Sequence, residues 1–272
     1  MAGRVSSQTR PPGRHSLRSR AFADELVRDA RVAPGSLVLD LGAGSGGLTR
    51  ALADARARVR AVELDPAALQ QLRARFGDDP RVEVVEGDAT AVRLPDEPFA
   101  VVANLPFAVG TAILRRLLGD PHVRLTQLDA IVEWGLAAKR TAVWPSTVLG
   151  CTWGAWYELS LVRRVSRACF APSPSVDAAL FRAIRRPEPL VQPAQADAYS
   201  ALLHRAFAAQ APLDRQLPRR LVHRAAHELG FDPHAGARDL DARQWARLYA
   251  AVRSATPRPR AAAARRRRGS RR

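Results

Sequence analysis

The feature that most constrains the fold is a regular alternation, in the first half of the chain, of short apolar runs with segments of helical periodicity. The apolar runs have the length of strands and are Leu37–Leu41, Val59–Leu64, Val82–Glu86, Phe99–Ala103 and Leu128–Val132. Three of the segments between them carry apolar residues at helical spacing, namely Leu48–Ala55, Ala67–Phe76 and Thr111–Leu118. Strands that alternate with helices in this way form a parallel sheet with helices on both faces. The predicted fold class is therefore α/β.

The flanking segments extend this prediction. Ala21–Ala30 has the pattern of a short amphipathic helix. Two later apolar runs, Glu158–Arg163 and Ala178–Ile184, have no clear helix between them and predict an antiparallel pair that closes the sheet. The proline-rich stretch from Arg186 to Pro193 is typical of a linker. The segments beyond it predict a small all-helical unit and are Ala196–Gln210, Leu217–Leu229 and Ala242–Ser254.

Positive charge is concentrated at the two ends of the chain. The 272 residues carry a formal net charge of +17, and Lys139 is the only lysine. Residues 1–20 hold five arginines and residues 258–272 hold eight, with no acid in either range. Such cationic ends favour a polyanionic partner. We divide the chain into a basic N-terminal arm (1–20), an α/β domain (21–186), a helical C-terminal domain (187–256) and a disordered arginine-rich tail (257–272).

Cysteine usage and hydropathy indicate a cytoplasmic protein with no membrane partner. Cys151 and Cys169 are too few for a disulfide framework and are wrongly spaced for a zinc site. The N-terminal segment has no apolar signal core; its arginine- and serine-rich composition also fits an organelle transit sequence, although it shows no amphipathic period. The longest charge-free stretch, Thr141–Tyr157, is too short and too polar to span a membrane.

A glycine-rich loop follows the first predicted strand. It reads Asp40-Leu41-Gly42-Ala43-Gly44-Ser45-Gly46-Gly47, and its glycines allow the backbone to turn tightly and approach a ligand closely. The same letters match the G-x-G-x-x-G fingerprint of dinucleotide-binding proteins, so a dehydrogenase is one alternative. Asp40 argues against it, because a carboxylate beside the loop would repel a pyrophosphate. The D-x-G-x-G pattern instead resembles motif I of the class I S-adenosylmethionine-dependent methyltransferases.

Two further acids follow the next two predicted strands. Glu63 ends the second strand, where a carboxylate can accept hydrogen bonds from both ribose hydroxyls. Asp88, followed by Ala89, comes after the third strand and can accept a proton of the adenine amino group. If either acid stood alone, a role in capping a helix or pairing with an arginine would explain it as well as a role in ligand binding. Three acids at successive strand ends, where ligands of open α/β sheets bind, favour a site for S-adenosyl-L-methionine.

The fourth predicted strand is followed by Asn104-Leu105-Pro106-Phe107. This tetrapeptide resembles the [NDS]-P-P-[YF] motif of amino-group methyltransferases. The side-chain oxygen of Asn104 and the carbonyl of Leu105 or Pro106 can accept the two amino protons of an adenine, so that the nitrogen lone pair points at the methyl group in a near-attack geometry. Phe107 would stack on a base splayed out of its helix or loop. Taken alone, the tetrapeptide is equally explained by a proline turn with a buried Phe.

Taken together, the motifs resemble those of the rRNA adenine N6-methyltransferases, and among these the erythromycin-resistance (Erm) methylases more closely than the small-subunit dimethylases. The resemblance covers about residues 13–190, and two segments that carry it besides the motifs above are Trp156–Leu159 and Phe170–Ala179. It implies a class I S-adenosylmethionine-dependent methyltransferase (Rossmann-like) sheet with a small all-helical C-terminal domain. It also implies a monomeric enzyme that methylates N6 of an adenine in 23S rRNA and confers macrolide resistance.

One segment departs from the family pattern. The family's Q-[NH]-F-L segment corresponds here to Arg14-His15-Ser16-Leu17, in which only His15 and Leu17 retain their type. The resemblance therefore assigns these two residues to the cofactor site. Two alternatives remain open, namely a small-subunit rRNA adenine dimethylase and a catalytically inert RNA-binding protein with the same fold.

The sequence predicts no catalytic or metal-binding role for two of the histidines and four of the tryptophans. His223 and His227 stand four residues apart on a predicted helix, but no acid or cysteine follows at metal-site spacing. We therefore expect a surface or capping role for them and no metal site. Four tryptophans are expected in the core: Trp134, Trp144, Trp153 and Trp156.

Overall fold

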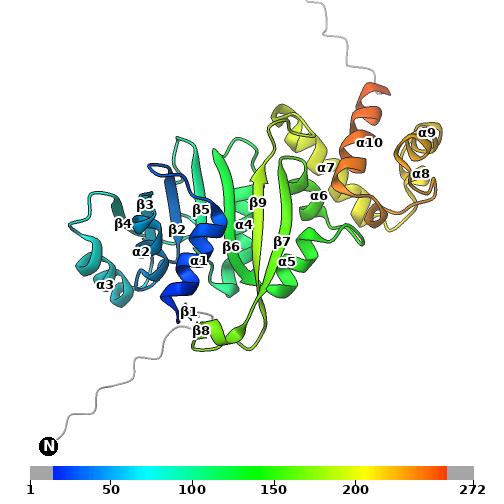
Figure 1. The fold of residues 1–272 in the computed structure, drawn as a ribbon. Coiled ribbons are helices and arrows are strands. Elements are labelled where there is room, and N and C mark those ends of the chain that lie inside the picture. The colour runs from blue at the N-terminus through cyan, green and yellow to red at the C-terminus, as the bar shows by residue number, and fades with distance from the viewer. Residues whose placement is uncertain (1–14, 256–272) are drawn as a thin grey trace, which may run out of the picture.

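A seven-stranded sheet in the order β4-β3-β2-β5-β6-β9-β7 forms the centre of the molecule (Figure 1) in a computed structural model that describes residues 15–255. Five neighbouring strands are parallel, and β9 runs antiparallel to both β6 and β7. The predicted parallel sheet and its antiparallel closing pair are thus confirmed. The strands are β2 (Leu37–Leu41), β3 (Arg58–Glu63), β4 (Val82–Glu86), β5 (Phe99–Asn104), β6 (Leu125–Glu133), β7 (Tyr157–Val165) and β9 (Ala178–Arg185).

Helices cover both faces of this sheet because its strands are apolar on both sides. In β2, Leu37, Leu39 and Leu41 belong to one buried cluster and Val38 to the other, as the alternation of side chains along a strand requires. The cluster that contains Val38 is completed by α1 (Arg20–Ala30), α2 (Gly47–Asp54) and α3 (Pro66–Phe76). The opposite cluster is completed by α4 (Gly110–Leu118), α5 (Trp134–Thr141) and α6 (Val148–Gly154).

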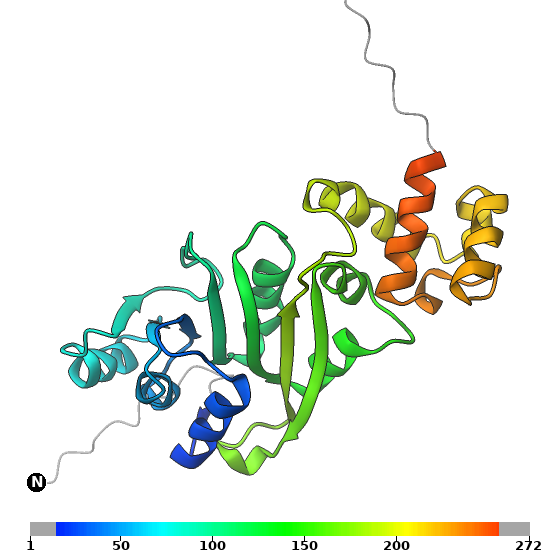
Figure 2. The same cartoon turned by 45° about the horizontal axis from the view of Figure 1, so that its top comes forward.

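The remaining helices gather beyond the β7 edge of the sheet in both views (Figures 1 and 2). They are α7 (Ala196–Ala208), α8 (Leu213–Gln216), α9 (Arg219–Leu229) and α10 (Ala242–Ala255). Trp156, between α6 and β7, meets Tyr199 of α7 edge to face at a centroid distance of 6.3 Å, and both side chains are fully buried. The buried apolar cluster therefore continues from the sheet into the C-terminal helices.

The sequence did not indicate α5, α6, α8 or the two-residue strands β1 (Ser16–Leu17) and β8 (Phe170–Ala171). Such short elements carry little periodicity, and β1 pairs with a strand about 150 residues away. Trp153 and Trp156 are buried as predicted, but the core prediction is wrong for Trp134 and Trp144, which are exposed. Trp134 begins α5 just beyond β6, and Trp144 lies in the following loop, where its indole N–H donates to the carbonyl of Asp239.

Residues 1–14 of the predicted basic arm and the predicted tail at 257–272 lie outside the described residues. Residues 15–20, at the end of that arm, form β1 and the start of α1. Among residues 15–255, no helix combines the length and apolarity needed to cross a membrane.

Candidate active site

The loop after β2 packs directly against the Asn104–Phe107 motif. Gly42 has φ +76°, and a Cβ at this position would lie 3.2 Å from Cδ of Pro106. Its N–H and that of Ala43 both donate to the carbonyl of Val62 in β3, at 2.9 and 3.0 Å. A glycine is needed here both for the left-handed backbone and for the close approach to Pro106. The two predicted motifs, separated by about 60 residues in sequence, are therefore in contact.

A pocket opens at the carboxyl ends of β2, β3 and β5. Ten of the twelve residues that the sequence singled out line it: His15, Leu17, Asp40, Gly42, Gly44, Glu63, Asn104, Leu105, Pro106 and Phe107. The topology explains this convergence, because parallel strands end at the same edge of the sheet.

Glu63 connects the glycine-rich loop to the end of β3. One carboxylate oxygen accepts the Gly44 N–H at 2.8 Å, and the other accepts the N–H groups of Leu64 and Asp65 at 2.8 and 2.7 Å. A carboxylate offers about four acceptor positions. Both ribose hydroxyls can therefore bind Glu63 only if at least one of these backbone bonds gives way.

Asp40 is a buried carboxyl group in β2. Thr49 of α2 donates its hydroxyl to it at 2.7 Å. Burial raises the pKa of Asp40 to about 7; the Thr49 hydrogen bond opposes this rise, and the nearby charge of Glu63 adds to it. A cation in the pocket would favour the ionised form of Asp40.

Asn104 ends β5 with one side-chain atom engaged and the other without a partner. Its Nδ2 donates to the carbonyl of His15 at 2.6 Å. This bond fixes the amide orientation and leaves Oδ1 as the unused acceptor. Oδ1 is buried and has no hydrogen-bond partner. Because a buried orphan acceptor costs about 1–3 kcal/mol, it marks a position where a donor from a ligand would be favoured.

The segment from His15 to Leu17 is held over the pocket by the chain around Phe170. Ser16 and Leu17 pair with Ala171 and Phe170, and one ring nitrogen of His15 lies 2.9 Å from the carbonyl of Pro172. The segment before α1 thereby becomes one wall of the pocket. This explains the position of His15 and Leu17, which the sequence placed only by resemblance.

Phe107 lies between two other rings at the mouth of the pocket. It begins the short 3-10 helix η1 (Phe107–Val109), with its ring centroid 5.4 Å from that of His15 and 6.3 Å from that of Phe170. Phe170 is fully buried and meets Phe107 edge to face, so it supports that ring. The proline-turn interpretation of the tetrapeptide thus accounts for its backbone but not for this cluster of rings beside an orphan acceptor.

Asp88 and Ala89 do not line the pocket. Asp88 is exposed beyond the end of β4 and accepts the Thr90 N–H at 2.8 Å. That hydrogen bond is the main cause of a lowered pKa for Asp88, so the group is ionised at neutral pH. Conversely, the pocket contains residues that the sequence analysis missed, among them Ser16, Asp65 and Ala68. Only Asp65 gave a local signal, because an Asp before Pro66 is typical of a helix N-cap.

The donor and acceptor set fits S-adenosyl-L-methionine. The pocket is lined by three acidic residues, Asp40, Glu63 and Asp65, which suit a ligand with a sulfonium and an ammonium group rather than a pyrophosphate. At Gly44, which has φ +59°, an added Cβ would meet no atom within 4 Å, so the backbone there faces open space. The orphan Oδ1 of Asn104 lies in the same pocket. Fold and pocket together define a class I S-adenosylmethionine-dependent methyltransferase.

Comparison with known proteins identifies the family. The ribosomal RNA adenine dimethylase family model matches residues 8–253. The mycinamicin-resistance protein MyrB of Micromonospora griseorubida is 37% identical over 257 residues, which cover 91% of this chain and 81% of MyrB. Ribosomal RNA small subunit methyltransferase A of Synechococcus sp. (strain JA-3-3Ab) is 33% identical, over 90% of this chain and 93% of the relative. Among solved structures, the 23S rRNA methyltransferase ErmE superposes with a TM-score of 0.76 at 31% identity, covering 87% of this chain and 99% of ErmE.

The chain therefore belongs to the ribosomal RNA adenine dimethylase family. It is an S-adenosylmethionine-dependent enzyme that methylates adenine N6 in ribosomal RNA. The dehydrogenase alternative is thereby excluded.

Proposed function

We propose that this enzyme methylates N6 of an adenine in 23S rRNA and so confers resistance to macrolide-class antibiotics. The observation that carries the proposal is the similarity over nearly the whole chain to MyrB, a mycinamicin-resistance protein, together with the superposition on the 23S rRNA methyltransferase ErmE. We further propose that it acts as a monomer in the cytoplasm, where ribosomes are accessible.

Asn104 and its neighbours position the reacting nitrogen. S-adenosylmethionine supplies an electrophilic methyl group on its sulfonium. The amino nitrogen of adenine is a weak nucleophile because its lone pair is delocalised into the ring. Oδ1 of Asn104 accepts a hydrogen bond from one amino N–H, and the Leu105 carbonyl accepts one from the other; the surplus proton passes to water once the nitrogen carries the methyl group. Leu105 is favoured over Pro106 because the Pro106 carbonyl already accepts the Val109 N–H at 3.1 Å. These two acceptors orient the lone pair towards the methyl group, and no strong base is required.

The remaining pocket residues divide between base and cofactor. Phe107 stacks on the flipped adenine, supported by Phe170. Two strand-end acids that line the pocket, Asp40 and Glu63, contact the cofactor. The other lining residues that we assign to cofactor binding are His15, Leu17, Gly42, Gly44 and Asn104. Asp88 and Ala89 follow β4 outside the pocket lining, and we assign them to the cofactor from their position in the sequence alone.

Arginines at the pocket edge of the sheet support RNA binding there. Because β9 is antiparallel to β6 and to β7, β7 ends at the same edge as the catalytic strands. Arg164 and Arg167 lie at this end with largely exposed guanidinium groups, both near Asp177. We do not assign this role to Arg163, because it pairs with Glu25 and Asp29 of α1. We propose that Arg164 and Arg167 contact RNA phosphates.

The terminal regions extend this RNA surface. We propose that residues 187–256 act as an RNA-binding domain and that the basic ends, residues 1–20 and 257–272, add contacts to RNA phosphates that do not depend on sequence.

The test is expression in a macrolide-sensitive bacterium, with drug resistance and rRNA modification read from the same cells. The chain carrying Asn104→Ala, expressed at the same level, is the matched control. We expect macrolide resistance and N6-methyladenine in 23S rRNA with the unaltered chain only. Modification of small-subunit rRNA without resistance would establish the dimethylase alternative. No modification of either rRNA, together with no calorimetric binding of S-adenosylmethionine, would establish an inert RNA-binding protein.

A further inference from the structure

Three potential metal ligands from separate segments converge among the C-terminal helices. Asp214 lies in α8, His223 lies in α9, and His234 follows α9 in the loop before α10. Nε2 of His223 is 3.4 Å and Nδ1 of His234 is 3.1 Å from the same Asp214 oxygen, Oδ2. One ligand-capable atom from each residue lies within 4.8 Å of the other two.

The backbone holds this arrangement in place. The N–H of Leu213, next to Asp214, donates to the carbonyl of Ala235, next to His234, at 2.9 Å. The N–H groups of His234 and Ala235 both donate to Asp232, at 2.8 Å each, so the loop is a closed turn. Backbone hydrogen bonds therefore hold the segments that carry Asp214 and His234 next to each other.

The carboxylate of Asp214 is incompletely satisfied. Its side chain is only 6% exposed, and its second oxygen, Oδ1, is buried with no hydrogen-bond partner. A carboxylate withdrawn from water with one oxygen unpartnered is costly unless a cation compensates its charge.

We propose that Asp214, His223 and His234 bind a divalent transition metal of the zinc type, with water completing the coordination. Ligand atoms of a tetrahedral zinc site stand about 3.3 Å apart when the bonds to nitrogen and oxygen are about 2.0–2.1 Å. The two nitrogen-to-Oδ2 distances, 3.4 and 3.1 Å, lie on either side of this value. Imidazole and carboxylate together suit zinc and its neighbours better than calcium or magnesium.

The sequence drew attention to a different pair of histidines and predicted no metal site. His223 and His227 have helical spacing, but His227 is exposed and is not part of the cluster. The acid that the sequence lacked at metal-site spacing comes from the preceding helix, and the second histidine comes from the loop after α9. The metal would thus join α8, α9 and that loop, and its effect would be to stabilise the C-terminal helices.

Arg219 competes with a metal for Asp214. Its Nε lies 3.8 Å from Oδ2, and its side chain is 71% exposed, so it can move into solvent when a cation binds. Removal of this positive charge should therefore strengthen metal binding.

The test uses the full chain, freed of any affinity tag and stripped of metal with a chelator. Zn²⁺ binding is measured by equilibrium dialysis and calorimetry, and Co²⁺ is used as a spectroscopic probe for its visible absorption. We expect one Zn²⁺ per chain and a rise in the melting temperature of roughly 5 °C at a 100-fold excess of metal over its Kd. His234→Ala should weaken binding by more than about tenfold and abolish the thermal shift.

His227→Ala is the matched control, because it removes an exposed histidine from the same helix as His223. It should bind Zn²⁺ as the unaltered chain does, and Arg219→Ala should bind it more tightly. The His234 side chain is 61% exposed, so its loss should leave the fold intact, which circular dichroism checks. The proposal is overturned if the unaltered chain binds no Zn²⁺, or if His234→Ala and His227→Ala bind it equally.

Discussion

At the scale of single residues, Asn104 combines a structural and a chemical role. It is the only asparagine among the 272 residues, in a chain whose basic residues are almost all arginine. Its Nδ2 donates to the carbonyl of His15 in the pocket wall, and its Oδ1 is left without a hydrogen-bond partner, as the proposed acceptor of an amino N–H of the target adenine. One side chain thereby couples the closure of the pocket to the orientation of its acceptor.

Asn104→Ala should abolish methylation while RNA binding persists. The turnover should fall by about 10²–10³-fold or more, a loss of the size seen when one preorganised polar group that faces the reacting atoms is removed. The affinity for S-adenosylmethionine should fall less, because the variant lacks only the hydrogen bond to His15 that closes the pocket wall. Single-turnover methylation, RNA gel shift and cofactor calorimetry separate the three effects. Near-normal turnover in the variant would refute the role.

Asp40 should make the stability of the cofactor-free enzyme depend on pH. Its pKa in the folded state is about 7, against 3.8 ordinarily, so between these values the folded state holds a proton that the unfolded state has released. The free energy of unfolding should therefore fall as the pH rises through this window, by up to about 1.4 kcal/mol per pH unit.

Asp40→Asn isolates this contribution, because its amide oxygen can still accept the Thr49 hydroxyl. Urea unfolding at pH 5, 6, 7 and 8 should show the unaltered chain losing stability relative to the variant as the pH rises towards 7, with a constant difference at higher pH. A difference that does not change with pH would contradict the raised pKa.

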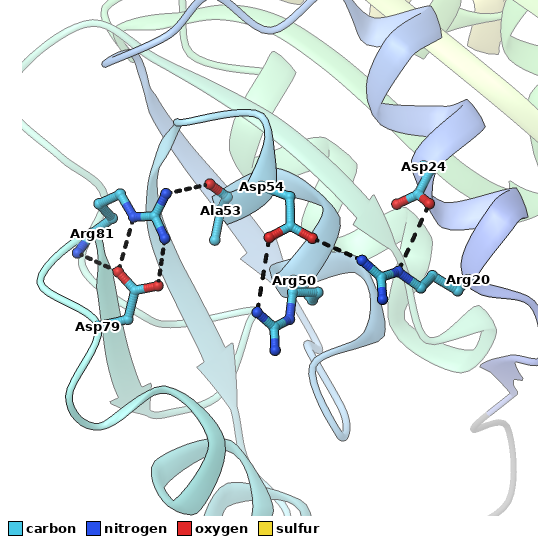
Figure 3. A network of polar contacts seen from close by, with 7 residues as sticks. All are labelled: Arg20, Asp24, Arg50, Ala53, Asp54, Asp79 and Arg81. Carbon is cyan, nitrogen blue, oxygen red and sulfur yellow. Dashed lines mark hydrogen bonds and ion pairs between the residues drawn. The ribbon is translucent and has the colours of Figure 1, made fainter.

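At the scale of elements, α2 ends in a network of arginine and aspartate side chains that joins it to its neighbours (Figure 3). Arg81, just before β4, donates to the carbonyl of Ala53 at 2.8 Å and binds Asp79 through two nitrogens, at 3.0 and 2.9 Å. Asp54 in the last turn of α2 pairs with Arg20 of α1 at 3.2 Å. The network supplies a second donor to a carbonyl in the last turn of α2, which also accepts the Arg56 N–H at 2.9 Å.

Arg81→Ala should lower the free energy of unfolding by about 0.5–1.5 kcal/mol, because it removes the hydrogen bond to the Ala53 carbonyl, which keeps the Arg56 N–H as its other donor. Arg93→Ala is the control. Arg93 and its partner Asp96 are 86% and 85% exposed, so that pair should contribute less than about 0.5 kcal/mol. Urea denaturation of both variants measures the difference, and equal losses would show that the Ala53 hydrogen bond has no special weight.

At the scale of the whole molecule, charge and chemistry occupy different parts of the chain. The pocket is formed by residues between 15 and 107, whereas eight arginines lie in residues 258–272. Deleting the chain from Pro257 onward should therefore weaken RNA binding and leave the affinity for S-adenosylmethionine unchanged.

The deletion should also reduce the salt dependence of RNA binding. The slope of log K against log salt should decrease by about 0.7–0.9 for each phosphate that the truncated chain no longer neutralises. Filter binding of 23S rRNA fragments at several salt concentrations gives this slope. An unchanged slope in the truncated chain would show that the tail makes no ionic interaction with RNA.

Local sequence patterns were sufficient to predict most strands of the sheet and most of the residues that line the pocket. The limits of β2 and β4 agree with the predicted runs to the residue, because apolar residues bounded by turn signals mark a buried strand. Asp40, Glu63 and Asn104 were found because each follows or ends such a strand, and parallel strands bring their ends together. Asp88 has the same sequence position but lies outside the pocket lining, since strand order alone does not fix how a loop turns.

What the sequence determined by itself is the periodic part of the protein: the α/β alternation, the motifs at strand ends and the cationic termini. The tertiary structure alone decided the contacts between distant segments. It placed His15 on Asn104 through the pairing of β1 with β8, left Oδ1 of Asn104 without a partner, and brought His234 rather than His227 to His223 and Asp214. The physical reason is that periodicity reports the burial of neighbouring residues, whereas a hydrogen bond or a ligand set joins atoms whose separation in the chain leaves no periodic signal.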